Sequence, residues 1–409
     1  MRDFLPAEKA RRERVLATIR ATYRAHGFDE IETPVMEDSD RLNAGLGGDN
    51  EKLAFGVLKR GLSAEDLHAA TEPLDLVDLG LRFDLTVPLA RFYATHRAAL
   101  PAVFRSIQVA PVWRAERPQK GRFRQFVQCD IDIIGESGIS AEAELLSATL
   151  ATVDALGLEA ATIRVNDRRL LIGMLQGFGF APAEFDAVLI TVDKLDKIGQ
   201  DGVVAELRDR GVTPAAVDAL ESFFRRPMTM EFLPFGEAAI RKFAAPDPDP
   251  DVVADLASLA DAVGADRLQF DPFLVRGMGY YTGPIFELAH PSVDYSLGGG
   301  GRYDGMIGRF LGSEVPATGF SLGFERLVEL VDVAADSSDG VALVYETGTS
   351  PAALFDIQRR LIAEGARVRL VSRPKNLKAL LSALAADGFT RFATVTAADP
   401  AAFELRPIE

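Results

Sequence analysis

The chain has 409 residues, of which 48% are hydrophobic and 26% charged, and its formal net charge at pH 7 is −15. This length exceeds one ordinary hydrophobic core, so we expect two or three globular domains. The negative charge disfavours a protein that coats nucleic acid indiscriminately, and a single cysteine excludes an internal disulfide or a cysteine cluster for zinc. No apolar leader and no apolar run of about 18 residues stands out, which predicts a cytosolic protein without membrane spans.

The first quarter of the chain predicts a helix, an edge strand and a small polar site. Residues 8–26 have helical periodicity and end before Gly27, a residue suited to the left-handed position after a helix. The strand that follows contains Pro34, which confines it to an edge or an interface. Further on, Asp84 and Thr86 share one face of a strand end ahead of a helix. That position suits either a helix cap or a bound ammonium group.

The most polar strand pair lies at residues 104–134. Runs at 104–114 and 123–134 flank a charged loop rich in proline and glycine, which is typical of a β-hairpin. Alternation along the second run places an arginine, an aromatic ring, an amide and two carboxylates on one face: Arg124, Phe126, Gln128, Asp130 and Asp132. Because an unpaired buried charge is costly, burial alone does not select these residues. We therefore predict that a polar, partly anionic ligand binds there.

The remainder of the chain has four further features. Residues 170–262 predict a helical module inserted between strand-rich segments. Four consecutive glycines at 298–301 predict either a flexible link or a place where backbone meets a ligand. Arg326 lies in the first turn of a predicted helix, where an anionic ligand would offset the unfavourable placement of a cation. Residues 340–409 read β-α-β-α-β, a pattern that favours a small α/β domain with parallel strands.

Five ordered segments resemble the class II aminoacyl-tRNA synthetases, and among them the histidyl-tRNA synthetase family. They are GFDEIETPVME (27–37), VWRAERPQKGRFRQFVQCDID (112–132), LVRGMGYYTG (274–283), GGGGRYDG (298–305) and GFSLGFER (319–326), while DKLDKIG (193–199) falls in the family's helical insertion. The resemblance covers nearly the whole chain and implies an α+β fold. Its parts would be a class II catalytic domain with an antiparallel sheet (1–169 and 263–332), the insertion (170–262) and a shortened α/β anticodon-binding-like domain (340–409).

The resemblance also implies a reaction, its substrates and its site. The enzyme would activate histidine with ATP to histidyl-adenylate and transfer it to the 3′ end of tRNA(His), with Mg²⁺ accompanying ATP. The residues expected to bind ATP are Arg114, Glu116, Arg122, Phe126 and Arg326, and the expected catalytic residues are Arg114, Arg276 and Arg326. The residues expected to bind histidine are Asp84, Thr86, Gln128, Asp132, Arg276, Tyr280 and Tyr281. The resemblance identifies no protein side chain as a metal ligand.

Within this resemblance, Asp132 and Tyr281 would read the two nitrogens of an imidazole, which offers one donor and one acceptor. The family pattern further implies a homodimer formed through residues 27–37. Asp84 and Asp132 stand where many bacterial members carry glutamate. Aspartate in this sequence context resembles the eukaryotic and archaeal branch. Gly279 stands where an aspartate is common.

Two alternatives remain from the sequence. One is the regulatory subunit of ATP phosphoribosyltransferase, a paralogue that shares the catalytic fold without charging tRNA. Such paralogues usually lose the motif arginines and the C-terminal domain, whereas Arg114, Arg122, Arg276 and Arg326 are present here. The other alternative is an enzyme that activates histidine for an acceptor other than tRNA.

Overall fold

The computed structural model describes residues 1–43, 53–117, 123–225, 234–244, 248–276, 280–332 and 340–408. Backbone contacts divide the chain into two compact units: Met1–Asp3 with Val15–Asp332, and Phe4–Arg14 with Val333–Glu409. None of the described helices combines the length and apolar character that a membrane crossing needs.

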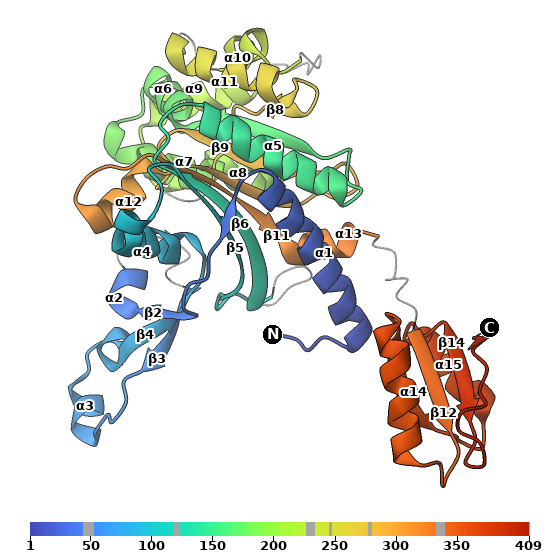
Figure 1. Ribbon diagram of the computed structural model, residues 1–409. Helices are drawn as coiled ribbons and strands as arrows, with labels where there is room; N and C mark the ends of the chain where they lie inside the picture. The colour runs from blue at the N-terminus through green and yellow to red at the C-terminus, as the bar shows by residue number, and fades with distance from the viewer. Residues whose placement is uncertain are drawn as a thin grey trace. The chain divides into compact units, whose positions relative to one another are not determined.

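The larger unit is built on an eight-stranded, mainly antiparallel sheet (Figure 1). Its spatial order is β1 (Asp29–Glu30), β5 (Phe104–Trp113), β6 (Gln125–Ile134), β11 (Ala317–Gly323), β10 (Gly298–Arg302), β9 (Pro284–Ala289), β7 (Thr162–Asp167) and β8 (Leu268–Phe270). Only the two outermost pairs, β1 with β5 and β7 with β8, are parallel. The sheet confirms the predicted α+β class.

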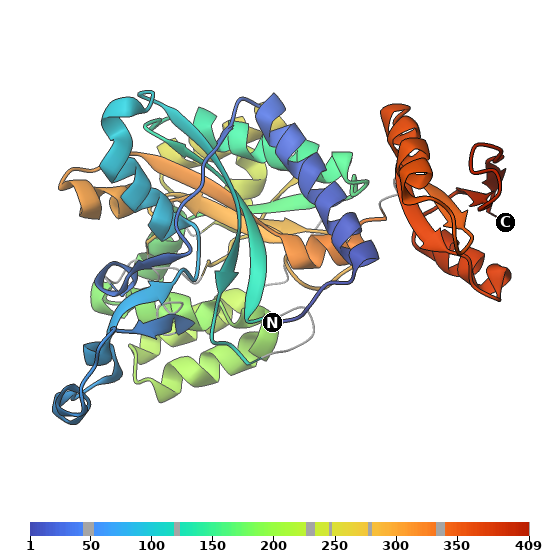
Figure 2. The ribbon, with the colours of Figure 1, turned by 60° about the horizontal axis from the view of Figure 1, so that its bottom comes forward.

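The predicted hairpin is confirmed as the pair β5 and β6. The two strands pair along their whole length, from Phe104 opposite Ile134 to Trp113 opposite Gln125, and both are visible as long strands in Figure 2. Residues 118–122 of the connecting loop lie outside the described part of the chain. The strand expected to contain Pro34 is instead interrupted: β1 ends at Glu30 on the edge of the large sheet, and Pro34 lies in no strand.

The four-glycine run forms β10, a central strand between β9 and β11, so the alternative of a flexible link is wrong. Its glycines are required by close backbone approach. A Cβ on Gly300 would lie 1.9 Å from the carbonyl oxygen of Gly319, and one on Gly301 would lie 2.5 Å from that of Pro284. No side chain fits in those spaces, and glycine alone allows the three strands to pair here.

Helices and a small second sheet complete the framework around the strands. The helix α5 (Ser140–Ala155) packs on one face of the large sheet, against β6 and β11 (Figure 1). A three-stranded sheet in the order β2 (Met36–Asp38), β4 (Val77–Leu81), β3 (Phe55–Leu58) extends away from the large one, as Figures 1 and 2 show. The other helices outside the insertion are α1 (Pro6–Ala25), α2 (Ser39–Leu42), α3 (Ala64–Ala69), α4 (Thr86–His96), α12 (Asp304–Leu311) and α13 (Phe324–Leu330), with 3₁₀ turns at Pro73–Leu76 and Arg97–Ala99.

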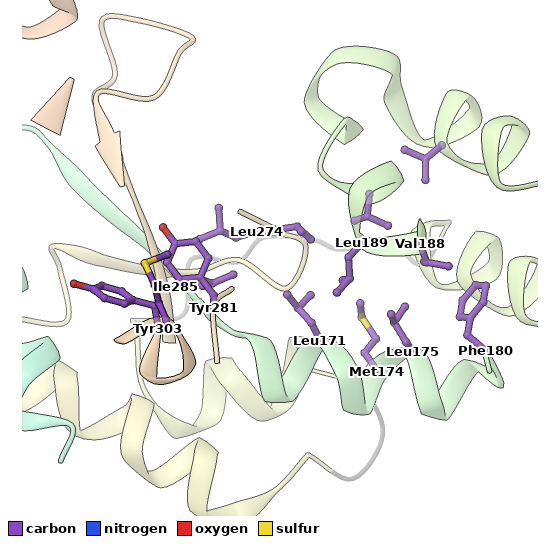
Figure 3. Packing of buried hydrophobic residues seen from close by; sticks show 14 of the residues in the cluster. Leu171, Met174, Leu175, Phe180, Val188, Leu189, Leu274, Tyr281, Ile285 and Tyr303 are labelled. Atoms are coloured by element: carbon purple, nitrogen blue, oxygen red, sulfur yellow. The ribbon is translucent and has the colours of Figure 1, made fainter. Parts of the chain in front are cut away.

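Between β7 and β8 the described chain is helical. Its helices are α6 (Arg168–Phe178), α7 (Phe185–Val192), α8 (Leu195–Asp209), α9 (Pro214–Phe224), α10 (Glu237–Phe243) and α11 (Pro250–Val263), with a 3₁₀ turn at Pro182–Glu184. In Figure 3 the apolar side chains of α6 and α7 meet, and the same buried cluster continues to Tyr281, Ile285 and Tyr303. Continuous apolar packing therefore joins these helices to the sheet, and the 170–262 boundary of a separate insertion stays a prediction.

The C-terminal unit contains a four-stranded sheet in the order β13 (Arg367–Ser372), β12 (Gly340–Tyr345), β14 (Arg391–Val395), β15 (Arg406–Pro407), with helices α14 (Pro351–Ala363) and α15 (Leu377–Ala386). The strand β12 pairs in parallel with both β13 and β14, which confirms the predicted β-α-β-α-β arrangement. The two-residue strand β15 adds an antiparallel edge that the sequence pattern did not indicate.

Candidate functional site

A pocket of about 290 Å³ lies over one face of the large sheet. All of the predicted site residues except Arg122 line it: Asp84, Thr86, Arg114, Glu116, Phe126, Gln128, Asp132, Arg276, Tyr280, Tyr281 and Arg326. Arg122, like Gly279, lies outside the described residues. The fold thus brings side chains from widely separated parts of the chain to one place.

Strand register explains this convergence. One residue from each of six neighbouring strands stands directly opposite the next, in the series Gln108, Asp130, Ser321, Gly299, Glu287 and Arg164. We call this series the polar row. Cross-strand neighbours point to the same face of a sheet, and three members of the row, Asp130, Ser321 and Gly299, line the pocket. Within the row, the Ser321 hydroxyl donates to Asp130; from outside the row, Gln128 Nε2 donates to Ser321 Oγ at 2.9 Å.

A second series, two residues away on the same face, forms a hollow beside a carboxylate. Here Asp132 stands opposite Gly319, and Gly319 stands opposite Gly301. A Cβ on Gly319 would lie 1.9 Å from Asp132 Oδ1, and one on Gly301 would lie 3.0 Å from Cδ1 of Tyr281. The missing side chains of the two glycines thus make room for the Asp132 carboxylate and the Tyr281 ring, and these residues together line a hollow of the pocket. Tyr303 adds a further contact, since its hydroxyl donates to Asp132 Oδ1 at 2.6 Å.

Burial strongly affects the acidic groups of the pocket. Desolvation raises the pKa of Asp132 to about 7, partly opposed by the hydrogen bond from Tyr303 and increased by the negative charge of Asp84. Desolvation, followed by repulsion from Asp132, also raises the pKa of Asp130 well above its usual range. Both effects disfavour the charged form. Clustered carboxyl groups with elevated pKa values are typical of a binding site rather than of a structural core.

The amide and carboxylate at the edge of the hollow suit a cationic group. Asp84 Oδ1 accepts the Val87 N–H in the first turn of α4 at 3.2 Å, although the N-cap residue itself is Leu85, and the same Asp84 lines the pocket. Gln128 Oε1 is buried and has no hydrogen-bond partner among the described residues. A buried acceptor of this kind is costly unless a donor reaches it.

Three arginines border the pocket. Arg114 Nε donates to the Phe83 carbonyl at 2.9 Å, and its guanidinium lies 5.0 Å from the Phe126 ring centroid. Burial lowers the pKa of Arg114, opposed by Asp84 and Glu116. Its guanidinium nevertheless stays charged at neutral pH, as arginine does in proteins generally.

The other two arginines are also held by protein groups. Arg326 Nη1 donates to the Ser296 carbonyl at 2.5 Å, and its guanidinium lies 5.3 Å from the Tyr295 ring centroid. Arg276 Nη1 donates to Glu287 Oε2 at 2.7 Å. Fixed positive charge at one pocket, next to an aromatic ring, is a suitable arrangement for a nucleotide phosphate.

Sequence reasoning missed several pocket residues. Tyr303 and Ser321 both lie inside the quoted segments GGGGRYDG and GFSLGFER, and Asp130 was placed on the polar face without a role. Alternation along β11 puts Ser321 and Gly319 on one face, which is a usable signal. The contact between Tyr303 and Asp132 depends on tertiary packing and has no sequence signal.

Comparison with known proteins gives consistent matches. A family model described as histidyl-tRNA synthetase matches residues 1–327. The histidine–tRNA ligase of Leifsonia xyli subsp. xyli is 59% identical over 418 aligned residues, covering 100% of this chain and 97% of that protein. The crystal structure of histidyl-tRNA synthetase from Nostoc sp. PCC 7120 matches with a TM-score of 0.76 and 25% identity, covering 99% of this chain and 93% of that one.

A further solved structure, described as an ATP phosphoribosyltransferase regulatory subunit/histidyl-tRNA synthetase from Bacillus halodurans C, has a TM-score of 0.74 at 20% identity. It covers 97% of both chains. A likeness at this identity concerns the fold alone, which a ligase and a regulatory paralogue share.

Proposed function

Because the chain belongs to the histidyl-tRNA synthetase family, we propose that it activates histidine with ATP and transfers the histidyl group to the 3′ end of tRNA(His). The observation that carries this proposal is a single pocket in which an acidic hollow lined by tyrosines adjoins three arginines. The hollow suits an amino acid with a polar ring, and the arginines suit a triphosphate.

In this proposal the histidine side chain enters the hollow beside Asp132. The carboxylate accepts a hydrogen bond from one imidazole nitrogen, and the Tyr281 hydroxyl donates one to the other. Asp84, Thr86 and Gln128 receive the α-amino group, and the buried, unpartnered oxygen of Gln128 supports this assignment. Tyr280 packs against Tyr281 with ring centroids 4.7 Å apart and closes the side of the hollow.

ATP occupies the part of the pocket with the arginines. Phe126 stacks on the adenine, Glu116 reads its edge, and Arg114 and Arg326 hold the phosphates. A carboxylate oxygen of histidine attacks the α-phosphorus and forms a new O–P bond. The bond from the α-phosphorus to the bridging oxygen breaks, and pyrophosphate leaves with its electron pair. Negative charge builds on the phosphate oxygens during this step. Arg114 and Arg276 therefore act by holding fixed positive charge and by positioning the reactants. Arg122 is assigned to the terminal phosphates on its family position alone.

Mg²⁺ is proposed to arrive with ATP. Magnesium prefers oxygen ligands and usually binds through phosphates, waters and one or two carboxylates. Glu325 fits this requirement, since it lines the pocket and its carboxylate is not assigned to either substrate. When bound, the ion would neutralise part of the phosphate charge.

The assembly and location of the protein are also proposals. Exposed apolar side chains in the segment 27–37, on the small sheet and on the two short helical turns between its strands β3 and β4 support a homodimer: Val35, Met36, Leu58, Leu67, Leu74 and Leu79. We assign anticodon binding to the C-terminal α/β unit and a cytosolic location to the protein. Sedimentation of the purified chain tests the dimer, and a single monomeric species would contradict it.

Two assays performed together test the function. Histidine-dependent ATP–pyrophosphate exchange should be observed, and the same preparation should charge tRNA(His). Absence of exchange would exclude both enzyme interpretations and favour the regulatory paralogue. Exchange without charging would favour transfer of histidine to another acceptor.

The assignment of Arg276 has its own test. We expect Arg276→Ala to remove most of the exchange rate while leaving the equilibrium affinity for histidine nearly unchanged, because its guanidinium acts on the reacting phosphate. Equal losses in rate and affinity would contradict this role.

A further inference from the structure

Arg276 is held by a chain of ion pairs that extends away from the pocket. Glu287 Oε2 accepts from Arg276 Nη1 at 2.7 Å, and Glu287 Oε1 accepts from Arg164 Nη1 at 3.0 Å. The other terminal nitrogen of Arg164 pairs with Asp271. Asp271 is itself anchored, because its Oδ1 accepts the Phe273 N–H at 2.9 Å. Three charged groups, Asp271, Arg164 and Glu287, thus connect the turn after β8 to the guanidinium in the pocket.

The polar row accounts for this arrangement. Arg164, Glu287 and Gly299 stand opposite one another on β7, β9 and β10. Gly299 has no side chain, and the Arg276 guanidinium lies in the space that one would fill: a Cβ there would be 2.6 Å from Cζ of Arg276. The Arg276 guanidinium therefore lies over Gly299 and beside Glu287.

The geometry of this contact depends on how the two oxygens of Glu287 are shared between Arg164 and Arg276. A carboxylate and a guanidinium ordinarily prefer a bidentate fork with two parallel hydrogen bonds. Arg164 occupies one oxygen of Glu287, which leaves one oxygen for Arg276. The guanidinium can then keep its other N–H donors toward the pocket that it lines.

We propose that Arg164 is a positioning residue, which holds Glu287 in a shared geometry and so prevents Arg276 from closing a bidentate pair with it. This inference rests on the proposed function for the role of Arg276. Without Arg164, both oxygens of Glu287 accept hydrogen bonds from Arg276, and the N–H donors of Arg276 turn away from the α-phosphate. Asp193, whose charge also acts on Arg276, and Asp196, 3.6 Å from Arg164, face the same network from the helical side.

The kinetic test uses Arg164→Met and a matched control. We expect this variant to lower kcat of ATP–pyrophosphate exchange by roughly 10- to 100-fold with little change in KM for histidine, because a misplaced catalytic group costs rate rather than affinity. Arg164→Lys, which keeps one charge for Glu287, should restore most of the rate. Arg105→Met is the control: it removes a comparable ion pair, with Glu144, on the opposite face of the same sheet and should leave kcat unchanged.

A double-variant cycle separates positioning from general support of the fold. If Arg164 acts through Arg276, Arg164→Met should have no further effect on kcat in an Arg276→Ala background. Additive losses would overturn the proposal. Adding Glu287→Gln to Arg164→Met should recover part of the rate, since an amide cannot form the charged fork.

A crystal structure of Arg164→Met without ligands decides the geometric claim independently of activity. The expected result is Arg276 paired with both oxygens of Glu287, and an unchanged single contact would overturn the proposal. If the unaltered protein shows no histidine-dependent exchange, the proposed function fails while this structure still tests the positioning.

Discussion

The hydroxyl of Tyr303 donates a hydrogen bond to Asp132 Oδ1 at 2.6 Å, although the two residues are 171 positions apart in the chain. This contact fixes the orientation of the carboxylate at the hollow and stabilises its ionised form. The family resemblance implied that Asp132 and Tyr281 each read one imidazole nitrogen, and it gave Tyr303 no role.

Tyr303→Phe is expected to weaken histidine binding. A hydrogen bond to a charged group contributes about 1.5–3 kcal/mol, and because this bond is also present without histidine, only part of it affects binding, so KM for histidine should rise by roughly 3- to 10-fold. Because that bond lowers the pKa of Asp132, its loss should also move the pH dependence of KM to higher pH. Exchange kinetics at several pH values measure both effects. Tyr93→Phe, a buried tyrosine that is not among the pocket residues, should change neither.

Histidine affinity should depend on pH near neutrality. Burial raises the pKa of Asp132 to about 7, so its carboxylate is lost as the pH falls through this value. KM for histidine should therefore rise as the pH decreases from 8 to 6. Part of the change comes from the imidazole of free histidine, whose pKa is about 6.5. In Asp132→Asn only that substrate titration should remain, and an identical profile in both proteins would contradict the assignment.

Gly319→Ala should abolish histidine binding, because the new methyl group would lie 1.9 Å from Asp132 Oδ1. Calorimetric titration of histidine into the folded variant measures this loss, and circular dichroism verifies folding. The matched control is Gly173→Ala on α6, where a Cβ meets nothing within 4 Å. That substitution should stabilise the helix by roughly 0.5–1 kcal/mol without altering binding. Normal affinity in Gly319→Ala would refute the proposed hollow.

The buried pair Arg302 and Glu142 predicts a stability effect separate from the site. Arg302 Nε donates to Glu142 Oε1 at 2.7 Å, and the glutamate is fully buried. Arg302→Met leaves a buried carboxylate without its partner and should lower the free energy of unfolding by about 3–5 kcal/mol.

The pH dependence of this loss identifies its cause. Burial already raises the pKa of Glu142, and removing Arg302 raises it further, so protonation at low pH should relieve the penalty. The difference between Arg302→Met and the unaltered protein should therefore shrink as the pH falls. Urea unfolding at pH 5 and pH 8 measures it. A constant difference would point to lost packing instead of an uncompensated charge.

Much of the framework was readable from local patterns. The hairpin at 104–134 and its polar face follow from alternation, and the C-terminal β-α-β-α-β order follows from periodicity. The glycine run was ambiguous, because its requirement for glycine comes from Gly319 and Pro284 on neighbouring strands. A local sequence pattern cannot reveal which strands will lie beside the glycine run in the sheet.

The same reason explains the missed network behind Arg276. Arg164 and Glu287 are separated by 123 positions and meet only because β7 and β9 pair in one register. In the sequence each resembles an ordinary surface charge.

The polar row draws one residue from each of six strands that come from distant parts of the chain. A slip of one residue in any strand would turn its member to the opposite face. A partly folded chain therefore lacks the site altogether, because the site needs all of these strands paired in register. During refolding, histidine-dependent exchange should appear only with the last strand to pair, later than the bulk of the secondary structure, and thereby mark completion of the sheet.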